Sequence, residues 1–214
     1  MREFLIKTFN CEEYAHRFLY NGEMRFAHVA LFQKIEDGKI RGDITEGLTI
    51  ETINADIAPN VTKFNLGKQY VVDWKGVKKQ FPELANNSGK YQFRIRYQVD
   101  WLIYCLTYIN STTADINKIL SMCTNFGEYS TVICDCKDFL SKVVNLIPNC
   151  QQGLVKYSNE EIKHPFIKPL DYSWQQEFRI AISACNNKER FFNIGKLVGF
   201  VCKTKSLYML KQVL

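Results

Sequence analysis

The clearest alternation of polar and apolar positions lies in residues 172–182. Apolar and polar side chains take turns there, with Phe178, Ile180 and Ile182 in one set and Gln175, Glu177 and Arg179 in the other. Successive side chains of a strand point to opposite faces, so this pattern predicts a strand with one face in the core. Charged groups are costly to bury. The polar face is therefore expected either to meet solvent or to line a polar cleft.

Other patterns predict the elements around this strand. Residues 3–9 alternate as a first strand, and apolar residues three and four apart over 11–19 predict a helix capped by Asn10 and closed by Asn21-Gly22. The continuously apolar run 101–108 is typical of a central strand. A helix is expected to begin at the cap Asp135 and to end before Pro148, with a core face of Phe139, Leu140, Val143, Val144 and Ile147.

The patterns together predict about nine strands and about three helices, with helices early and strands late. This order favours an α+β fold with a mixed or antiparallel sheet over a doubly wound parallel fold. The 214 residues are expected to form a single domain, 1–214. Pro82 and the run Asn86-Asn-Ser-Gly89 predict an irregular insertion at 75–90.

Composition places the chain among globular proteins, with 46% hydrophobic and 23% charged residues. No apolar run reaches the roughly 20 residues that a membrane helix needs. The segment from Met1 to Lys7 lacks the apolar core of a signal peptide. We therefore expect a cytoplasmic protein with no membrane partner.

Eight cysteines are spread along the chain without a Cys-x-x-Cys pair. Several lie within apolar patterns, so they are expected to be reduced and mostly buried. A zinc site at Cys134 and Cys136 would need two further ligands from a pool of only three histidines. No metal is therefore expected.

The net charge of +6 is unevenly distributed. The basic stretch 63–96 carries eight Lys and Arg residues against Asp73 and Glu83, which suits a nucleic-acid or acidic protein partner as well as a plain solvated face. The segment 36–47 before it is rich in glycine and carboxylates. We expect a binding loop there, formed by Arg41, Asp43 and Glu46 with His28 at the end of the preceding strand.

The chain resembles a set of uncharacterised bacterial and phage-associated proteins. The landmarks are Glu36-Asp37-Gly38, Arg41-Gly42-Asp43, Glu46-Gly47 and Gln176-Glu177-Phe178-Arg179. The triplet Gln175-Gln176-Glu177 and the pair Ser130-Thr131 are also similar to the ADP-ribosyltransferase superfamily. Two positions depart from that superfamily: Lys7 stands where an Arg or His is usual, and Val132 stands where a third hydroxyl is usual.

The second resemblance implies NAD as cofactor and a macromolecular acceptor, with a role in the conflict between bacteria and phages. Glu177 would stabilise the developing oxocarbenium ion, and Gln175 or Arg179 would orient the acceptor or a phosphate. Lys7 would contact the pyrophosphate. Ser130 and Thr131 would hold the edge of their strand against the ribose.

Two alternatives remain open from the residues themselves. One is a binding protein without catalysis that acts through the 36–47 loop and the basic stretch 63–96. The other is a metal-dependent nuclease, with Glu36, Asp37, Asp43 and Glu46 around magnesium. If the 36–47 loop meets the Glu177 strand across one cleft, an enzyme site is favoured, and if the two lie apart, a binding protein is favoured.

Overall fold

The computed structural model describes residues 2–32, 48–57, 63–66, 70–80, 89–98, 100–113, 115–159, 164–183 and 188–212. The chain divides into two compact units: unit 1 is Met1–Leu48 with Gln98–Leu214, and unit 2 is Thr49–Tyr97. The single domain expected for 1–214 is thus resolved into two units. Of the expected irregular insertion at 75–90, residues 75–80 are helical and residues 89–90 belong to a strand, whereas residues 81–88 lie outside the described residues.

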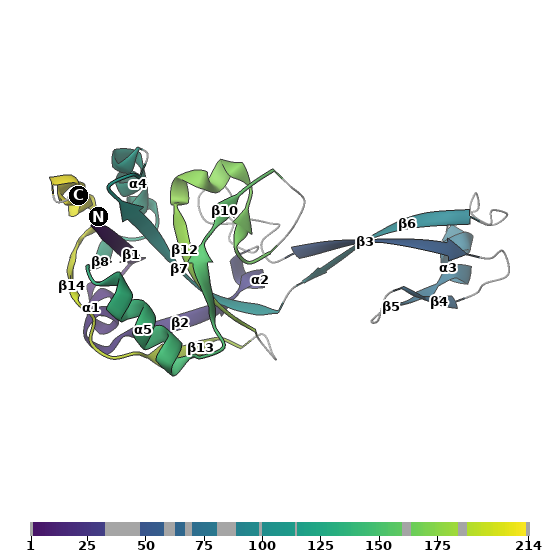
Figure 1. Ribbon diagram of the computed structural model, residues 1–214, viewed down its shortest axis with the longest axis horizontal. Helices are drawn as coiled ribbons and strands as arrows, with labels where there is room; N and C mark the ends of the chain where they lie inside the picture. Colours follow the sequence, from purple (N-terminus) through teal and green to yellow (C-terminus); the bar gives the residue numbers. More distant parts are fainter. Residues whose placement is uncertain are drawn as a thin grey trace. The chain divides into compact units, whose positions relative to one another are not determined.

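Unit 1 contains helices and strands from both ends of the sequence (Figure 1). Its strands are β1 (Glu3–Phe9), β2 (Glu23–His28), β7 (Trp101–Asn110), β8 (Tyr129–Ile133), β9 (Gln151–Leu154), β10 (Lys156–Tyr157), β11 (Ile167–Lys168), β12 (Glu177–Ser183), β13 (Arg190–Asn193) and β14 (Gly199–Lys203). Its helices are α1 (Glu12–Asn21), α2 (Val29–Phe32), α4 (Ile116–Met122) and α5 (Cys136–Leu146), with 3₁₀ helices η2 (Cys123–Asn125), η3 (Leu170–Gln175) and η4 (Thr204–Gln212).

Eight of these strands form one sheet, in the order β13-β2-β7-β1-β8-β14, with β12 paired to β7 and β9 paired to β12. Every pairing in this sheet is antiparallel. The α+β class is therefore confirmed, and the apolar run 101–108 lies in the central strand β7. One edge of β7 pairs with β12 from Trp101 to Thr107. Strands β1 and β2 therefore both pair with the other edge of β7.

Side chains alternate between the two faces of this sheet, as the two-residue period requires. One face packs against α1 and α5, in a core that includes Leu5, Phe18, Leu102, Phe139 and Ile180. The opposite face packs against α4 and η4, in a cluster that includes Phe4, Ile6, Ile109, Leu120 and Leu207. A smaller cluster of Val29, Ile103 and Ala181, with Phe166 packed against it, lies elsewhere on that opposite face. The sheet is thus covered on both sides.

The predicted helix ends are largely confirmed. The carboxylate of Asp135 accepts a hydrogen bond from the backbone N–H of Asp138 at 2.9 Å and caps α5. Gly22 ends α1 with a φ of 62°, a left-handed conformation that glycine adopts without strain. Two details were wrong: Cys11 rather than Asn10 precedes α1, and Val144 is 40% exposed rather than part of the core.

The predicted strand over 172–182 begins later than expected. Residues 170–175 form η3, and Gln176 has a φ of 46°, which breaks the extended backbone before β12 starts at Glu177. From there the predicted alternation is confirmed. Ile180 and Ile182 lie in the main core, and Arg179 lies on the opposite face of the strand.

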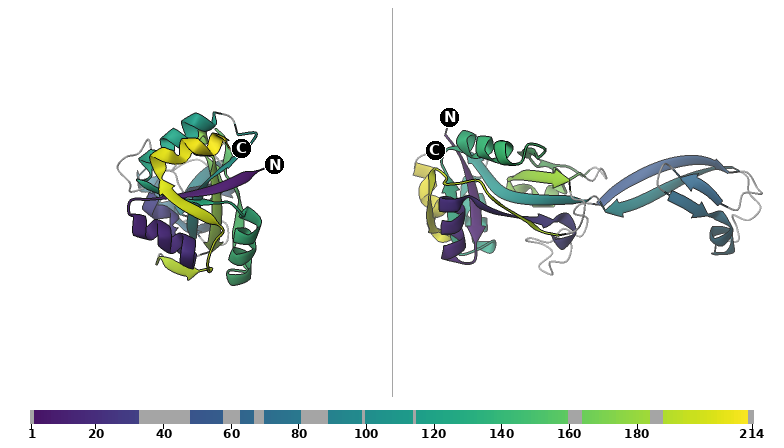
Figure 2. Two further views of the ribbon diagram at one scale, coloured as in Figure 1. Left: turned by 90° about the vertical axis from the view of Figure 1, so that its left-hand side faces the viewer. Right: turned by 90° about the horizontal axis from the view of Figure 1, so that it is seen from below.

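Unit 2 has its own small set of elements. Strands β3 (Leu48–Ile57) and β6 (Gly89–Gln98) form a two-stranded sheet, and β4 (Lys63–Leu66) pairs antiparallel with β5 (Tyr70–Asp73) (Figure 2). Helix α3 (Trp74–Gln80) follows β5 directly. Trp74 is only 1% exposed, so it anchors the start of this helix.

Two further expectations concern cysteines and membrane spans. The seven cysteines within the described residues are free thiols, but only Cys123 and Cys136 are fully buried, fewer than expected. Over the same residues, no helix is both long and apolar enough to cross a membrane.

Candidate functional site

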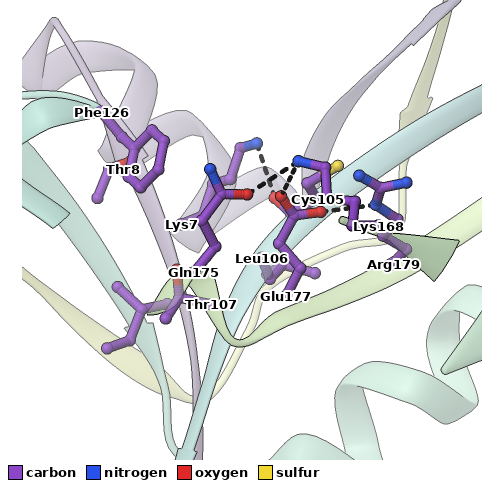
Figure 3. Close-up of a pocket in the computed structure, with 11 residues that line it drawn as sticks. Lys7, Thr8, Cys105, Leu106, Thr107, Phe126, Lys168, Gln175, Glu177 and Arg179 are labelled. Carbon is purple, nitrogen blue, oxygen red and sulfur yellow. Dashed lines mark hydrogen bonds and ion pairs between the residues drawn. The ribbon is translucent and has the colours of Figure 1, made fainter. Parts of the chain in front are cut away.

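A cavity of about 190 Å³ lies in unit 1, on the face of the sheet that also carries the Ile6 and Ala181 clusters (Figure 3). We call it the Glu177 pocket. It is lined by Ile6, Lys7, Thr8, Cys105, Leu106, Thr107, Phe126, Lys168, Gln175, Glu177 and Arg179. Most of its polar side chains come from three neighbouring strands and the end of η3. The pocket is therefore a polar gap on an otherwise apolar face.

An ion cluster holds one side of this pocket. Lys168 donates from Nζ to Oε1 of Glu177 at 2.8 Å and to Oε1 of Gln175 at 2.8 Å. Arg179 donates from Nε to the other carboxylate oxygen, Oε2 of Glu177, at 2.6 Å (Figure 3). Lys168 is 4% exposed and Arg179 is 1% exposed. Both oxygens of the Glu177 carboxylate are therefore engaged by buried cations.

The electrostatics of Glu177 follow from this cluster. Burial by itself would raise the pKa of its carboxyl group, but Arg179 and Lys168 outweigh burial and hold that pKa at about 2. The Glu177 backbone N–H donates to Oη of Tyr157 at 2.9 Å, and Arg179 also donates to the carbonyl of Pro165. The carboxylate is thus ionised and fixed from several directions.

Lys7 lines the same pocket, and its contacts differ from those of the ion cluster. Its Nζ donates to the carbonyl of Cys105 at 2.8 Å and lies 4.5 Å from the centre of the Tyr104 ring. Burial lowers the pKa of Lys7, while the neighbouring Cys105 and Glu177 act in the opposite direction. An ammonium group has three N–H donors. Only one of them has an assigned acceptor among the described residues.

The path of β1 explains how Lys7 reaches this position. Pairing of β1 with β7 runs as far as Ile6 opposite Thr107, and β1 then continues along β8. Pairing of β2 with β7 covers Ala27 opposite Ile103 and the next residue. Between these two partners the edge of β7 opens, so the Cys105 carbonyl accepts from a side chain instead of a strand.

A second, larger cavity of about 690 Å³ lies where β1 and β2 diverge. We call it the Tyr14 cavity. Its rim holds two ion pairs, Arg17 with Glu23 and Arg25 with Glu189. Lys7 and Cys105 belong to the lining of this cavity as well as to that of the Glu177 pocket. The two cavities therefore share a wall.

Of the residues expected to form a site, the fold brings together Lys7, Gln175, Glu177 and Arg179. Ser130 and Thr131 lie elsewhere. Both are fully buried, with Ser130 Oγ 2.9 Å from Oγ1 of Thr204 and Thr131 Oγ1 donating to the carbonyl of Ala15 at 2.8 Å. Their hydroxyl groups are part of the core, so the expected contact with a ribose is not supported by their position.

Of the residues expected to form the binding loop, the structure describes only His28. Arg41, Asp43 and Glu46 lie outside the described residues, as do Glu36 and Asp37 of the nuclease alternative. His28 is buried at the end of β2, with Nε2 3.5 Å from Oδ1 of Asp100. It does not belong to the described lining of either cavity.

Sequence reasoning named four of the eleven lining residues, and Lys168, Thr107 and Phe126 are among those it missed. Lys168 lies on the two-residue strand β11, which is too short to show a period. Thr107 belongs to the apolar run of β7, so the sequence pattern does not indicate that it lines a polar pocket. Phe126 stacks on Trp174 with ring centres 5.7 Å apart and an interplanar angle of 18°.

The arrangement favours anion binding over acid/base catalysis. Among the described residues of the lining, Lys7, Lys168 and Arg179 carry positive charge and Glu177 alone carries negative charge. The Glu177 carboxylate is paired twice and has a low pKa, which makes it a poor proton acceptor near neutral pH. Within the part of the chain that the structure describes, no group of three or more His, Cys, Asp and Glu could hold a metal ion.

No family model, curated protein or solved structure matches the chain. The similarity to the ADP-ribosyltransferase superfamily therefore rests on sequence landmarks alone. The chemistry of the Glu177 pocket is the basis for assigning a function.

Proposed function

We propose that unit 1 binds a small phosphate-bearing ligand in the Glu177 pocket, with Lys7 as the primary contact. One observation carries this proposal. The Lys7 ammonium group faces a pocket while its contacts in the described structure are one carbonyl oxygen and one aromatic ring. It retains donors for a ligand, whereas the Glu177 carboxylate is already neutralised by two cations.

The surroundings of Lys7 strengthen an anion contact. Charges interact more strongly in a partly desolvated pocket than in water. Lys168 and Arg179 line the same pocket and add to the positive potential. Phe126 and the Trp174 ring on which it stacks supply an apolar surface beside the cations. The pocket therefore suits a ligand with an anionic group attached to an apolar or aromatic part.

Binding is tested by calorimetry on the full chain with inorganic phosphate, AMP and ADP-ribose. Lys7→Gln is expected to weaken binding at least 10-fold, because it removes the charge and keeps most of the length of the side chain. Lys7→Arg should retain part of the affinity. The matched control is Lys118→Gln, at an exposed position of α4 outside both cavities. Equal affinity in the native and Lys7→Gln proteins would contradict the proposal.

Proton uptake gives an independent measure. An anion beside Lys7 stabilises the charged ammonium and raises the pKa that burial lowers. As the pH rises towards the lowered pKa of Lys7, binding should therefore take up protons, and the observed heat should depend on the ionisation enthalpy of the buffer. This dependence should disappear in Lys7→Gln. A fold defect in the variant is checked by its thermal unfolding midpoint without ligand.

A second candidate is ADP-ribosyl transfer from NAD, which is favoured by the meeting of Lys7, Gln175 and Glu177 in one pocket. The bond between the ribose C1 and the nicotinamide nitrogen would break, and nicotinamide would leave with the bonding electrons. The nucleophile of the acceptor would then bond to C1 and release its proton. For this reaction Glu177 must exchange Lys168 or Arg179 for the ribose as a partner.

Nicotinamide release from NAD separates the two candidates. Turnover by the native protein that is lost in Glu177→Gln would support the transferase. Binding of NAD or ADP-ribose without turnover, across a panel of protein and nucleic-acid acceptors, would support the binding protein and exclude the transferase for those acceptors.

Two broader expectations belong to the same proposal. The free thiols of the seven cysteines that the structure describes support a cytoplasmic location, because thiols stay reduced there. A protein or nucleic-acid acceptor would meet the chain through the basic stretch 63–96. Both are tested in cells, by fractionation and by crosslinking of the full chain.

A further inference from the structure

Unit 2 holds most of the net positive charge of the chain. The whole chain has 28 Lys and Arg residues against 22 Asp and Glu residues. Residues 49–97 contribute eight Lys and Arg residues and four Asp and Glu residues. Less than a quarter of the sequence therefore carries four of the six net positive charges. Such a concentration attracts polyanions and makes their binding sensitive to salt.

Helix α3 presents part of this charge to solvent. Lys75 and Lys79 are both exposed and lie one helical turn apart. The buried Trp74 fixes the start of the helix, and the Asp73 carboxylate accepts from the backbone N–H of Gly76 at 3.2 Å. The two lysines are therefore held on an ordered element. Lys63, on β4 opposite Asp73, is also exposed.

Polar and apolar residues alternate along the sequence of strand β6. Its even-numbered positions are polar or basic and its odd-numbered positions after Gly89 are aromatic or aliphatic: Lys90, Gln92, Arg94, Arg96 and Gln98 against Tyr91, Phe93, Ile95 and Tyr97. Its described strand partner is β3 alone, in a two-stranded sheet. Two-stranded ribbons bury little surface by themselves. Ribbons of this kind fit the major groove of DNA, and basic positions interleaved with aromatic ones suit single strands.

We propose that unit 2 is a nucleic-acid-binding module in which α3 and β6 contact the phosphate backbone. The inference does not depend on the function of the Glu177 pocket. The alternation of basic and aromatic positions on an ordered strand favours nucleic acid over an acidic protein, for which clustered charge alone would suffice. Contacts to phosphates do not depend on the base sequence, in keeping with the exposed Lys63, Lys75 and Lys79.

Fluorescence anisotropy of the full chain with labelled single-stranded DNA, double-stranded DNA and RNA, from 50 to 300 mM salt, tests this proposal. Two double variants are used, Lys75→Gln with Lys79→Gln, and Arg94→Gln with Arg96→Gln. Each should reduce the slope of log Kd against log salt by about 1 to 2, because two phosphate contacts are lost. The first pair is exposed on a helix surface and keeps the fold. The control is Lys118→Gln with Lys205→Gln, which removes two exposed charges from unit 1 and should change nothing.

The outcomes are distinct. Binding to any one of the three nucleic acids, with slopes that fall in the unit 2 variants and not in the control, supports the module. Absence of binding at 50 mM salt, equal loss in the control, or equally tight competition by poly-glutamate would overturn it, and the last result would indicate an acidic protein partner. Lys7→Gln should bind nucleic acid normally, so failure of the small-ligand proposal leaves this one standing.

Discussion

The Nε of Arg179 donates to Oε2 of Glu177 across 2.6 Å, between two residues on the same face of β12. Lys168 engages the other oxygen of the same carboxylate. Separating charges from water is costly, and the cluster offsets that cost only because each group has a partner. Glu177 therefore has a structural role before it has any role toward a ligand.

Replacement of Glu177 by Gln should lower the free energy of unfolding by about 3 kcal/mol, because two buried cations lose their carboxylate. Urea unfolding measures this change. The matched control is Glu128→Gln: Glu128 forms an ion pair with Lys203 at 3.5 Å, with both side chains more than half exposed. That change should stay within roughly 0.5 kcal/mol. Identical urea midpoints for the two variants would contradict the structural role of Glu177.

The same carboxylate sets a pH dependence. Its pKa is about 2 in the folded protein against a usual value of 4.5, so the folded state binds the proton more weakly than the unfolded state. The stability that Glu177 contributes is present above about 4.5 and is lost as the pH falls towards about 2. Unfolding midpoints across that range should fall less steeply for Glu177→Gln than for the native protein. Parallel curves would show that other carboxyl groups account for the loss.

Reactivity of the thiols should follow their surroundings. Burial raises the pKa of Cys105 and Cys123 to about 11 and that of Cys136 to about 12. The thiolate is the reactive form, so these three should resist iodoacetamide at pH 8 while the exposed Cys11 reacts first. Mass spectrometry of timed samples gives the order. Labelling under denaturing, non-reducing conditions should then find all eight thiols, and missing pairs would reveal disulfides.

Gly127 should tolerate no side chain. A Cβ atom there would lie 2.5 Å from the backbone C and O atoms of Phe9, in the strand that carries Lys7. Gly127→Ala should therefore cost about 1 to 3 kcal/mol of stability and weaken ligand binding, because β1 must shift. At Gly153 the nearest atoms to such a Cβ are 3.9 Å away, so Gly153→Ala is the control. Native binding in Gly127→Ala would show that β1 does not set the position of Lys7.

Local patterns predicted the parts of this protein that depend on local chemistry. The Asp135 cap, the Gly22 stop and the placement of Glu177 and Arg179 opposite Ile180 each follow from neighbouring residues in sequence. The start of β12 did not follow, because the left-handed conformation of Gln176 interrupts a sequence that alternates through it.

Long-range contacts explain the remaining differences. Lys168 reaches Glu177 from the two-residue strand β11, and no periodicity marks such a short element. Ser130 and Thr131 lie on the predicted strand, but their partners Thr204 and Ala15 are distant in sequence. A hydroxyl group on a strand has the same local pattern whether it binds a ligand or a neighbouring helix.

Lys7 lies in the wall that the Glu177 pocket and the Tyr14 cavity share. Its side chain and Cys105 belong to the lining on both sides, and Lys7 donates to the Cys105 carbonyl on the stretch of β7 that lies between its pairing with β1 and its pairing with β2. The cavities of about 190 and 690 Å³ therefore have one ammonium group in common. A substitution of Lys7 that removes its charge changes both cavities at once.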